Sequence, residues 1–160
     1  MARGYMGKML MANLTNNELK DEVLDEKLGR QFIGGYGIGA RIIFSRQNAG
    51  VDPLGPDNTL GILTGPFTST PALSGTKFTV VGKSPLTGGW GDANSGGYFG
   101  ARLKFAGYDA VFFTGKSEKP IYLADFGEIG HLSAPNRPLV RPNRSPCEKG
   151  SGSGVGMAIV

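Results

Sequence analysis

One stretch of the sequence limits the possible folds more than any other: GGWGDANSGGYFGARLKFAGYD, residues 88–109. Six of its first thirteen residues are glycine, and a helix-like pattern begins directly afterwards. Glycine weakens any helix or strand that contains it, so such a cluster marks backbone that turns sharply or approaches another group closely. We therefore expect a glycine-rich loop followed by a helix from about Gly97 to Ala106.

The other patterns predict short strands and short helices. Apolar residues four apart predict a short helix over 24–35, closed by Gly34 and Gly35, and a second helix follows over 37–47. Five or six strands with three short helices and little βαβ alternation indicate an α+β fold. Runs rich in apolar and β-branched residues, bounded by Gly or Pro, predict strands at 59–65 and 76–85. We also expect short strands at 7–15, 18–23, 109–115 and 120–126.

The composition changes after about residue 130. Residues 135–146 contain four prolines, and Gly and Ser alternate from residue 150 onwards. Such composition favours a loop, a linker or disorder. We expect one domain over residues 1–130 and an atypical Pro/Gly/Ser-rich tail over residues 131–160.

Net charge and cysteine content exclude several classes of protein. The last thirty residues account for +3 of the formal net charge of +4, whereas a nucleic-acid-binding domain carries its basic side chains on one face of the folded body. Cys147 is the only cysteine, which excludes an internal disulfide and suits a reducing compartment. No signal peptide is recognisable, and no apolar run approaches the roughly 20 residues of a membrane span. We expect a cytoplasmic protein without nucleic-acid or membrane partners.

The glycine-rich loop is the strongest candidate for a binding site. Where such a loop enters a helix, several backbone N–H groups and the positive end of the helix dipole converge, which favours an anion. Asn94 and Ser95 are residue types that cap helices. The stretch contains neither a P-loop nor a dinucleotide-binding fingerprint. The residues alone leave two interpretations open: a phosphate-bearing ligand, or a tight structural turn that closes a β layer.

Two further pairs of residues near this loop allow a binding role or an ordinary one. Lys77 and Lys83 are six apart in a predicted strand, so they fall on one face of the sheet, either as part of an anion site or as a solvated face. Trp90 and Tyr98 suit either a planar ligand or simple packing.

No residue in the chain has the context of a catalytic group. His131 lacks neighbours at metal-ligand spacing, and Cys147 lacks a histidine partner. Asp92 and Asp109 flank the loop and the helix, without the local context of an acid–base pair. The pattern therefore indicates a binding piece rather than a whole enzyme.

Several of these motifs together resemble a known family. The segments GPFTSTPALSGTKFTVVGKSPLTGGWGDANSGGYFGARLKFAGYDAVFFTGKSEKPIYL, FIGGYGIGAR and GVDPLGPDN are similar to the N-terminal domain of the aldehyde:ferredoxin oxidoreductase family. Its members are tungsten, occasionally molybdenum, enzymes with a bis-pterin cofactor and one 4Fe–4S cluster. The resemblance extends from about Gly4 to Gly127. It implies an α+β fold of two packed, twisted β-sheets with a few short helices, which form a platform for the pterin pair.

The resemblance also implies roles for residues of the loop. Asn94 and Gly96 would contact the cofactor, with Ser95 and Gly97 as supporting backbone. The Asn94 backbone would help to hold a magnesium ion that bridges the pterin phosphates. A position that is usually arginine in the family falls on Lys77, which keeps the charge but loses the planar fork of the guanidinium. The family's cluster ligands and substrate-binding groups belong to later domains, so the resemblance implies no catalytic residue here.

By this resemblance the chain is the cofactor-binding N-terminal part of an enzyme that oxidises aldehydes to carboxylic acids and passes electrons to ferredoxin. Its partners would be the remaining domains or subunits, ferredoxin and, in a homo-oligomer, further copies, and the chain alone would be inactive. The alternatives are part of an aromatic acyl-CoA reductase of the same family, a non-catalytic pterin-binding module and a non-functional fragment. The family pattern ends near residue 130, where a frameshift, deletion or truncated gene model would explain the tail.

Overall fold

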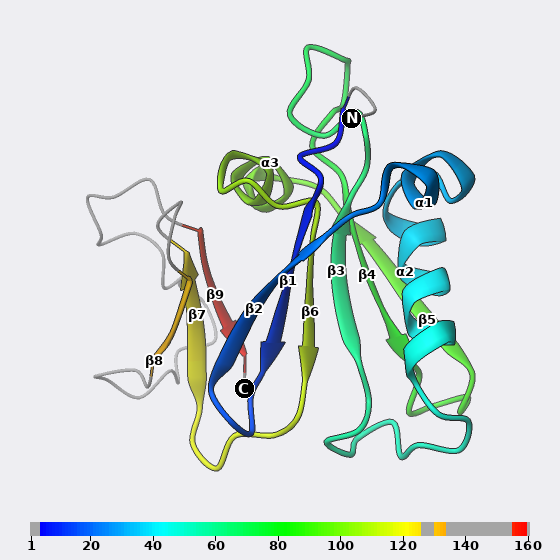
Figure 1. Ribbon diagram of the computed structural model, residues 1–160, viewed down its shortest axis with the longest axis vertical. Coiled ribbons are helices and arrows are strands. Elements are labelled where there is room, and N and C mark those ends of the chain that lie inside the picture. Colours follow the sequence, from blue (N-terminus) through cyan, green and yellow to red (C-terminus); the bar gives the residue numbers. More distant parts are fainter. Residues whose placement is uncertain (1–3, 126–129, 134–154, 160) are drawn as a thin grey trace.

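The computed structural model describes residues 4–125, 130–133 and 155–159. Within these residues the chain forms two β-sheets and three short helices (Figure 1). The elements, in chain order, are β1 (Lys8–Asn13), β2 (Glu18–Val23), α1 (Glu26–Gln31), α2 (Gly34–Arg46), β3 (Leu60–Thr64), β4 (Phe78–Lys83), β5 (Trp90–Ser95), α3 (Tyr98–Phe105), β6 (Ala110–Thr114), β7 (Ile121–Asp125), β8 (Gly130–Ser133) and β9 (Val155–Ile159).

The larger sheet is mixed and has six strands in the order β2-β1-β6-β3-β4-β5. Its parallel pair is β1–β6, in which Met9 lies beside Ala110, and its other pairs are antiparallel. The smaller sheet has the order β8-β7-β9 and is antiparallel. The predicted α+β class is confirmed, with a mixed sheet and a few short helices.

The larger sheet is covered on both faces near its centre. Successive side chains of a strand point to opposite faces, and in β6 the buried Phe112 packs with α2 while Val111 and Phe113 pack with α3 and β7. This explains why β6 is an uninterrupted apolar run rather than an alternating one. In Figure 1, α1 and α2 lie on one side of the sheet, and α3 and the smaller sheet lie on the other. No helix among the described residues is long and apolar enough to cross a membrane.

The helix boundaries differ from the prediction at Gly34 and Gly35. These residues were expected to close a helix over 24–35, but α1 ends at Gln31 and α2 already begins at Gly34. Gly34 has φ +70, a backbone conformation that glycine adopts without steric cost. A Cβ on Gly35 would lie 3.2 Å from the carbonyl oxygen of Leu63. The two glycines therefore start α2 and let it approach β3 closely, instead of ending α1.

Three strands lie where the sequence predicted loop structure. β5 lies in the first part of the glycine-rich stretch and forms a ladder with β4 over its whole length. It was missed because neither of its faces is apolar and buried, so it has no alternating pattern. β8 and β9 pair with β7 in the part of the chain whose composition favoured a loop or linker. The domain boundary near residue 130 remains a prediction.

Candidate functional site

The fold brings the five predicted site residues together at one end of the β4–β5 ladder. Lys77 directly precedes β4, and Asn94 and Ser95 end β5. Because Phe78 lies opposite Ser95, the start of β4 and the end of β5 are neighbours. Gly96 and Gly97 then lead into α3. We call this place, formed by Lys77 and residues 94–97, the β5–α3 junction.

At the junction, the side chain of Asn94 is held by a residue that the sequence did not single out. The Thr79 hydroxyl donates a hydrogen bond to Asn94 Oδ1 at 2.7 Å. Thr79 is 8% exposed, whereas Asn94 is exposed. The two residues are directly opposite each other in the antiparallel register, so the bond crosses the ladder on the face that carries α2.

The glycines leave the junction open on its outer side. A Cβ on Gly96 would lie 3.9 Å from Lys77 Nζ, which places the exposed lysine beside this glycine. Gly97 has φ +94, and a Cβ there would meet no atom within 4 Å. The Ser95 hydroxyl donates to the Gly96 carbonyl at 3.5 Å. Within the described residues no side chain caps the start of α3.

This set of groups suits an anion chemically. It combines the Lys77 ammonium and the Asn94 amide, whose side chains are exposed, with the N–H groups of the first turn of α3, which begins at the exposed Tyr98. A helix N-terminus and an ammonium both favour negative charge. Among the residues that the structure describes, no group of three His, Cys, Asp or Glu side chains could hold a metal ion. The junction therefore fits the phosphate groups of a ligand, and any metal bound there would depend on carbonyl and phosphate oxygens.

Lys83 shares a face with Lys77 but serves the fold. Its ammonium donates to the carbonyl of Val51 at 2.7 Å, which ties the loop before β3 to the far end of β4. Alternation along β4 places both lysines on one face, as predicted. They do not converge on one ligand, because the whole length of β4 separates them.

The two aromatic residues singled out above, Trp90 and Tyr98, lie at opposite ends of β5 and pack in different ways. Trp90 packs against Tyr36 of α2 with 6.1 Å between ring centroids. A hydrogen bond with the Asp92 carboxylate raises the pKa of the Tyr36 hydroxyl above its ordinary value. Tyr98, by contrast, is 86% exposed at the start of α3. Packing therefore accounts for Trp90, whereas a contact of Tyr98 with a planar ligand remains a prediction.

A second cluster of charged groups is buried beneath α3. The Lys104 ammonium forms an ion pair with the Asp109 carboxylate and donates to the Gly4 carbonyl at 2.7 Å. The same carboxylate accepts hydrogen bonds from the backbone N–H groups of Met6, at 3.0 Å, and Gly7, at 2.6 Å. Lys104 and Asp109 are 3% and 2% exposed. Every polar atom of this pair has a partner within the protein, so it stabilises the fold and offers nothing to a ligand.

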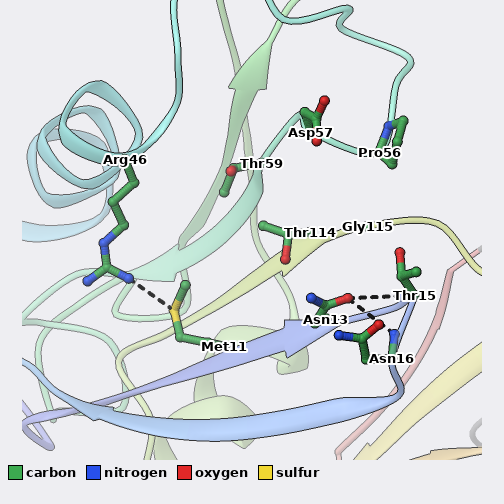
Figure 2. A pocket seen from close by; sticks show the side chains of 10 residues that line it. All are labelled: Met11, Asn13, Thr15, Asn16, Arg46, Pro56, Asp57, Thr59, Thr114 and Gly115. Atoms are coloured by element: carbon green, nitrogen blue, oxygen red, sulfur yellow. Dashed lines mark hydrogen bonds between the residues drawn. The ribbon is translucent and has the colours of Figure 1, made fainter.

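A polar hollow of about 420 Å³ lies away from the junction (Figure 2). Asn13 ends β1 and Thr59 precedes β3, whereas the junction is next to the other end of β3. Asn13 Oδ1 already accepts from the backbone N–H groups of Thr15 and Asn16. Arg46 donates to the sulfur of Met11 in Figure 2 and forms an ion pair with Glu22. Asn13 and Arg46, two of its polar lining residues, are therefore already engaged with neighbouring groups.

One contact at the junction and one in the buried ion pair could not be predicted from the sequence. Thr79 matters only through its register with Asn94, and the ladder between β4 and β5 was not predicted. The partners of Lys104 include the backbone of Gly4, one hundred residues earlier. Cys147 lies outside the described residues, and so does the side chain of His131.

Comparison with known proteins agrees with the fold and identifies the family. The family model for the aldehyde ferredoxin oxidoreductase N-terminal domain matches residues 9–124. A tungsten-containing aldehyde ferredoxin oxidoreductase of Pyrococcus furiosus is 47% identical over 120 residues, which are 75% of this chain and 20% of the relative. The corresponding protein of Pyrococcus abyssi is 46% identical over the same shares. The chain thus spans about a fifth of the length of these relatives.

Two other relatives extend the comparison. The WOR-like subunit of an aliphatic sulfonate oxidoreductase from Pyrococcus furiosus is 38% identical over 122 residues, covering 74% of this chain and 19% of the subunit. Among solved structures, the active-site complex BamBC of benzoyl coenzyme A reductase, in complex with 1,5-dienoyl-CoA, matches with a TM-score of 0.81 and 29% identity. That match covers 84% of this chain and 20% of the other. The chain belongs to the aldehyde ferredoxin oxidoreductase family and represents its N-terminal domain.

Proposed function

We propose that this chain is the cofactor-binding N-terminal part of a tungsten-containing, or molybdenum-containing, pterin oxidoreductase. The whole enzyme would oxidise aldehydes to carboxylic acids and deliver the electrons to ferredoxin in the cytoplasm. The observation that carries this proposal is the β5–α3 junction, where an ammonium, an amide and a helix N-terminus meet beside two glycines. The names and the 46–47% identity of the tungsten-containing relatives support the choice of cofactor.

Each residue of the junction has a specific part in this proposal. Lys77 would neutralise phosphate charge on the pterin, and Gly96 and Gly97 would let phosphate oxygens reach the backbone. The backbone carbonyl of Asn94 would supply a hard oxygen ligand to magnesium, which prefers such ligands. Ser95 would hold the turn through its contact with the Gly96 carbonyl.

The bound metal–pterin group would supply the two-electron redox chemistry, while the chain would orient it and balance its charge. We place the ligands of the 4Fe–4S cluster and the substrate-binding groups in the remaining domains or subunits. Those domains, ferredoxin and, in a homo-oligomer, further copies are the proposed partners. The chain alone would be inactive.

The proposal is tested by purifying the tagged chain from its native host and measuring tungsten, molybdenum and oxidised pterin in the complex it forms. We expect pterin and metal to co-purify with the chain and the remaining domains. Lys77→Gln should lower the pterin content, because the variant loses the ammonium beside Gly96. Lys20→Gln is the matched control, because Lys20 is exposed on the distant edge strand β2. A wild-type complex without pterin would contradict the proposal.

The similarity to BamBC favours one second function, the reduction of an aromatic acyl-CoA. The two functions differ in the substrate rather than in the junction. The purified complex should therefore be assayed with aliphatic and aromatic aldehydes and, separately, with an aromatic acyl-CoA and a strong reductant. If the complex converts the acyl-CoA but no aldehyde, the second function would replace aldehyde oxidation in the proposal. If the complex contains pterin but converts neither substrate, the result would favour a non-catalytic pterin-binding module.

A further inference from the structure

We propose that Thr79 is a positioning residue that locks the side-chain amide of Asn94 so that its nitrogen, and not its oxygen, faces the ligand. This inference rests on the proposed function, because it concerns the group that the junction presents to an anion. It adds to that proposal a role for Thr79 and an orientation for the side-chain amide of Asn94.

The lock is a single short hydrogen bond across the ladder. The Thr79 hydroxyl donates to Asn94 Oδ1 at 2.7 Å, and the two residues are directly opposite in the register of β4 and β5. A hydroxyl has one proton to donate. That proton is used on Asn94, so the carbonyl end of the amide points to Thr79 and into the sheet.

Helix α2 restricts Thr79 in turn. A Cβ on Gly35 would lie 3.1 Å from the Thr79 hydroxyl oxygen and 3.2 Å from its Cβ, so the helix backbone closely covers the threonine. Threonine is branched at Cβ and has few accessible χ1 angles. Because Thr79 is only 8% exposed, little space remains for another rotamer. The close approach of α2 therefore fixes the direction of the hydroxyl.

The consequence is a donor surface at the end of β5. An asparagine amide has one acceptor oxygen and two N–H donors. With Oδ1 engaged, the exposed part of Asn94 is its Nδ2 group, for which the described residues supply no acceptor. It lies at the same end of the ladder as Lys77 and Gly96. The side chain thus adds a donor for an anion such as a phosphate, while its oxygen points to Thr79 and not to the ligand.

The first experiment observes the amide in the ¹⁵N-labelled 160-residue chain without any ligand. The side-chain NH₂ signals of Asn94, assigned by their loss in Asn94→Asp, should show a rigid amide by relaxation. Thr79→Val keeps the shape and removes the hydroxyl, and we expect the Asn94 amide to become mobile. Thr79→Ser keeps the hydroxyl and should restore a rigid amide. A rigid amide in Thr79→Val would overturn the lock.

The second experiment titrates the same proteins with inorganic phosphate at constant ionic strength and pH. Phosphate should shift the Asn94 NH₂ signals of the wild type, and Thr79→Val should weaken its binding about three- to tenfold, the effect of losing one ordered hydrogen bond. Thr64→Val is the matched control. It removes another buried hydroxyl, which donates to the Asp109 carbonyl at 2.9 Å, without touching Asn94. We expect it to change stability and leave phosphate binding unchanged.

The two experiments separate the two proposals. If phosphate shifts no junction signal of the wild type, the anion site of the proposed function is contradicted, and the ligand-free relaxation alone decides the lock. If phosphate binds equally to the wild type and Thr79→Val, the positioning role is overturned while the anion site stands. Equal weakening in Thr79→Val and Thr64→Val would reduce Thr79 to a structural residue.

Discussion

Two lysines near opposite ends of α3 show how differently this fold treats positive charge. Lys104, in the last turn of the helix, is 3% exposed and surrounded by the Asp109 carboxylate and the Gly4 carbonyl. Lys77, beside the loop that starts the helix, is exposed and lies next to Gly96. A buried charge persists only when it is paired and hydrogen-bonded. Lys104 therefore stabilises the fold, whereas Lys77, for which the described residues supply no hydrogen-bond or ion-pair partner, is available to a ligand.

The same contrast extends to the backbone around each lysine. Around Lys104 the N-terminal segment is joined to the start of β6, because Asp109 accepts from the N–H groups of Met6 and Gly7. Around Lys77 the side chains that could fill the space are replaced by Gly96 and Gly97. The contacts around Lys104 thus attach the last turn of α3 to the rest of the fold, whereas the glycines near Lys77 leave the start of α3 accessible.

The largest expected effect comes from removing the buried charge. Lys104→Met leaves the Asp109 carboxylate buried without its cation, and breaking such a pair costs about 3–5 kcal/mol. Lys77→Met makes the same substitution at the exposed site and should change the free energy of unfolding by less than about 0.5 kcal/mol. Urea denaturation of both variants measures the difference. Equal losses of stability would break the comparison between the two lysines.

A smaller loss is expected where α2 packs closely on the sheet. A Cβ on Gly39 would lie 2.8 Å from a methyl group of Val81, which is 1% exposed. Gly39→Ala should therefore cost about 1–3 kcal/mol by overpacking. Gly29→Ala in α1, where the Cβ would lie 3.4 Å from the Tyr5 ring, should be neutral or gain up to about 1 kcal/mol from helix propensity. Thermal unfolding compares the two, and an unaffected Gly39→Ala would show that α2 can shift away from the sheet.

Much of this architecture could be predicted because most strands are buried on at least one face. The runs that became β1, β3, β4 and β6 are rich in apolar residues, and those of β3, β4 and β6 also contain β-branched residues, which a half-buried sheet favours. β5 escaped prediction because Trp90 and Asn94 are exposed on one of its faces and Ala93 on the other. Gly34 was assigned to a helix end, since the sequence does not show that its φ of +70 begins a helix.

Part of the candidate site could also be predicted from the sequence, and part could not. Lys77 and residues 94–97 were selected by resemblance and by the loop-to-helix pattern, and the structure brings them together. Their roles toward a cofactor remain predictions. Thr79 and Lys104 could not be selected, because each acts through a partner that only the tertiary fold brings near.

At Gly96 and Gly97, backbone strain should lower the free energy of unfolding more than crowding of an added methyl group does. Gly97→Ala meets no atom within 4 Å but places a Cβ on a residue with φ +94 and ψ −161, a region that is essentially restricted to glycine and costs other residues about 1–3 kcal/mol. Gly96→Ala would make ordinary contact, 3.8 Å from the Thr76 hydroxyl, and should leave stability nearly unchanged. Urea denaturation of both variants separates conformational strain from crowding. A harmless Gly97→Ala would show that the start of α3 adopts another backbone conformation.

The smallest expected effect comes from an exposed ion pair that resembles the buried one in chemistry alone. Lys8 Nζ lies 2.8 Å from the Asp21 carboxylate, with side chains 41% and 49% exposed. The hydrogen bond from Lys8 is the main reason that the pKa of Asp21 lies below its ordinary value of 3.8, with a second hydrogen bond from Tyr108 acting in the same direction against partial burial. Solvent screening limits such a pair to about 0.5 kcal/mol.

The pH dependence of this pair follows from the direction of the shift. A carboxyl group with a lowered pKa in the folded state stabilises the protein above the ordinary pKa of 3.8, and this stabilisation disappears as the pH falls through the lowered value. The difference in unfolding free energy between the wild type and Lys8→Met should therefore be full at pH 6 and vanish at low pH. Added salt should also reduce it, because exposed charges are screened. If Lys8→Met destabilised the protein as much as Lys104→Met at pH 6, burial would not be what separates the two pairs, and the contrast between Lys104 and Lys77 would lose its physical basis.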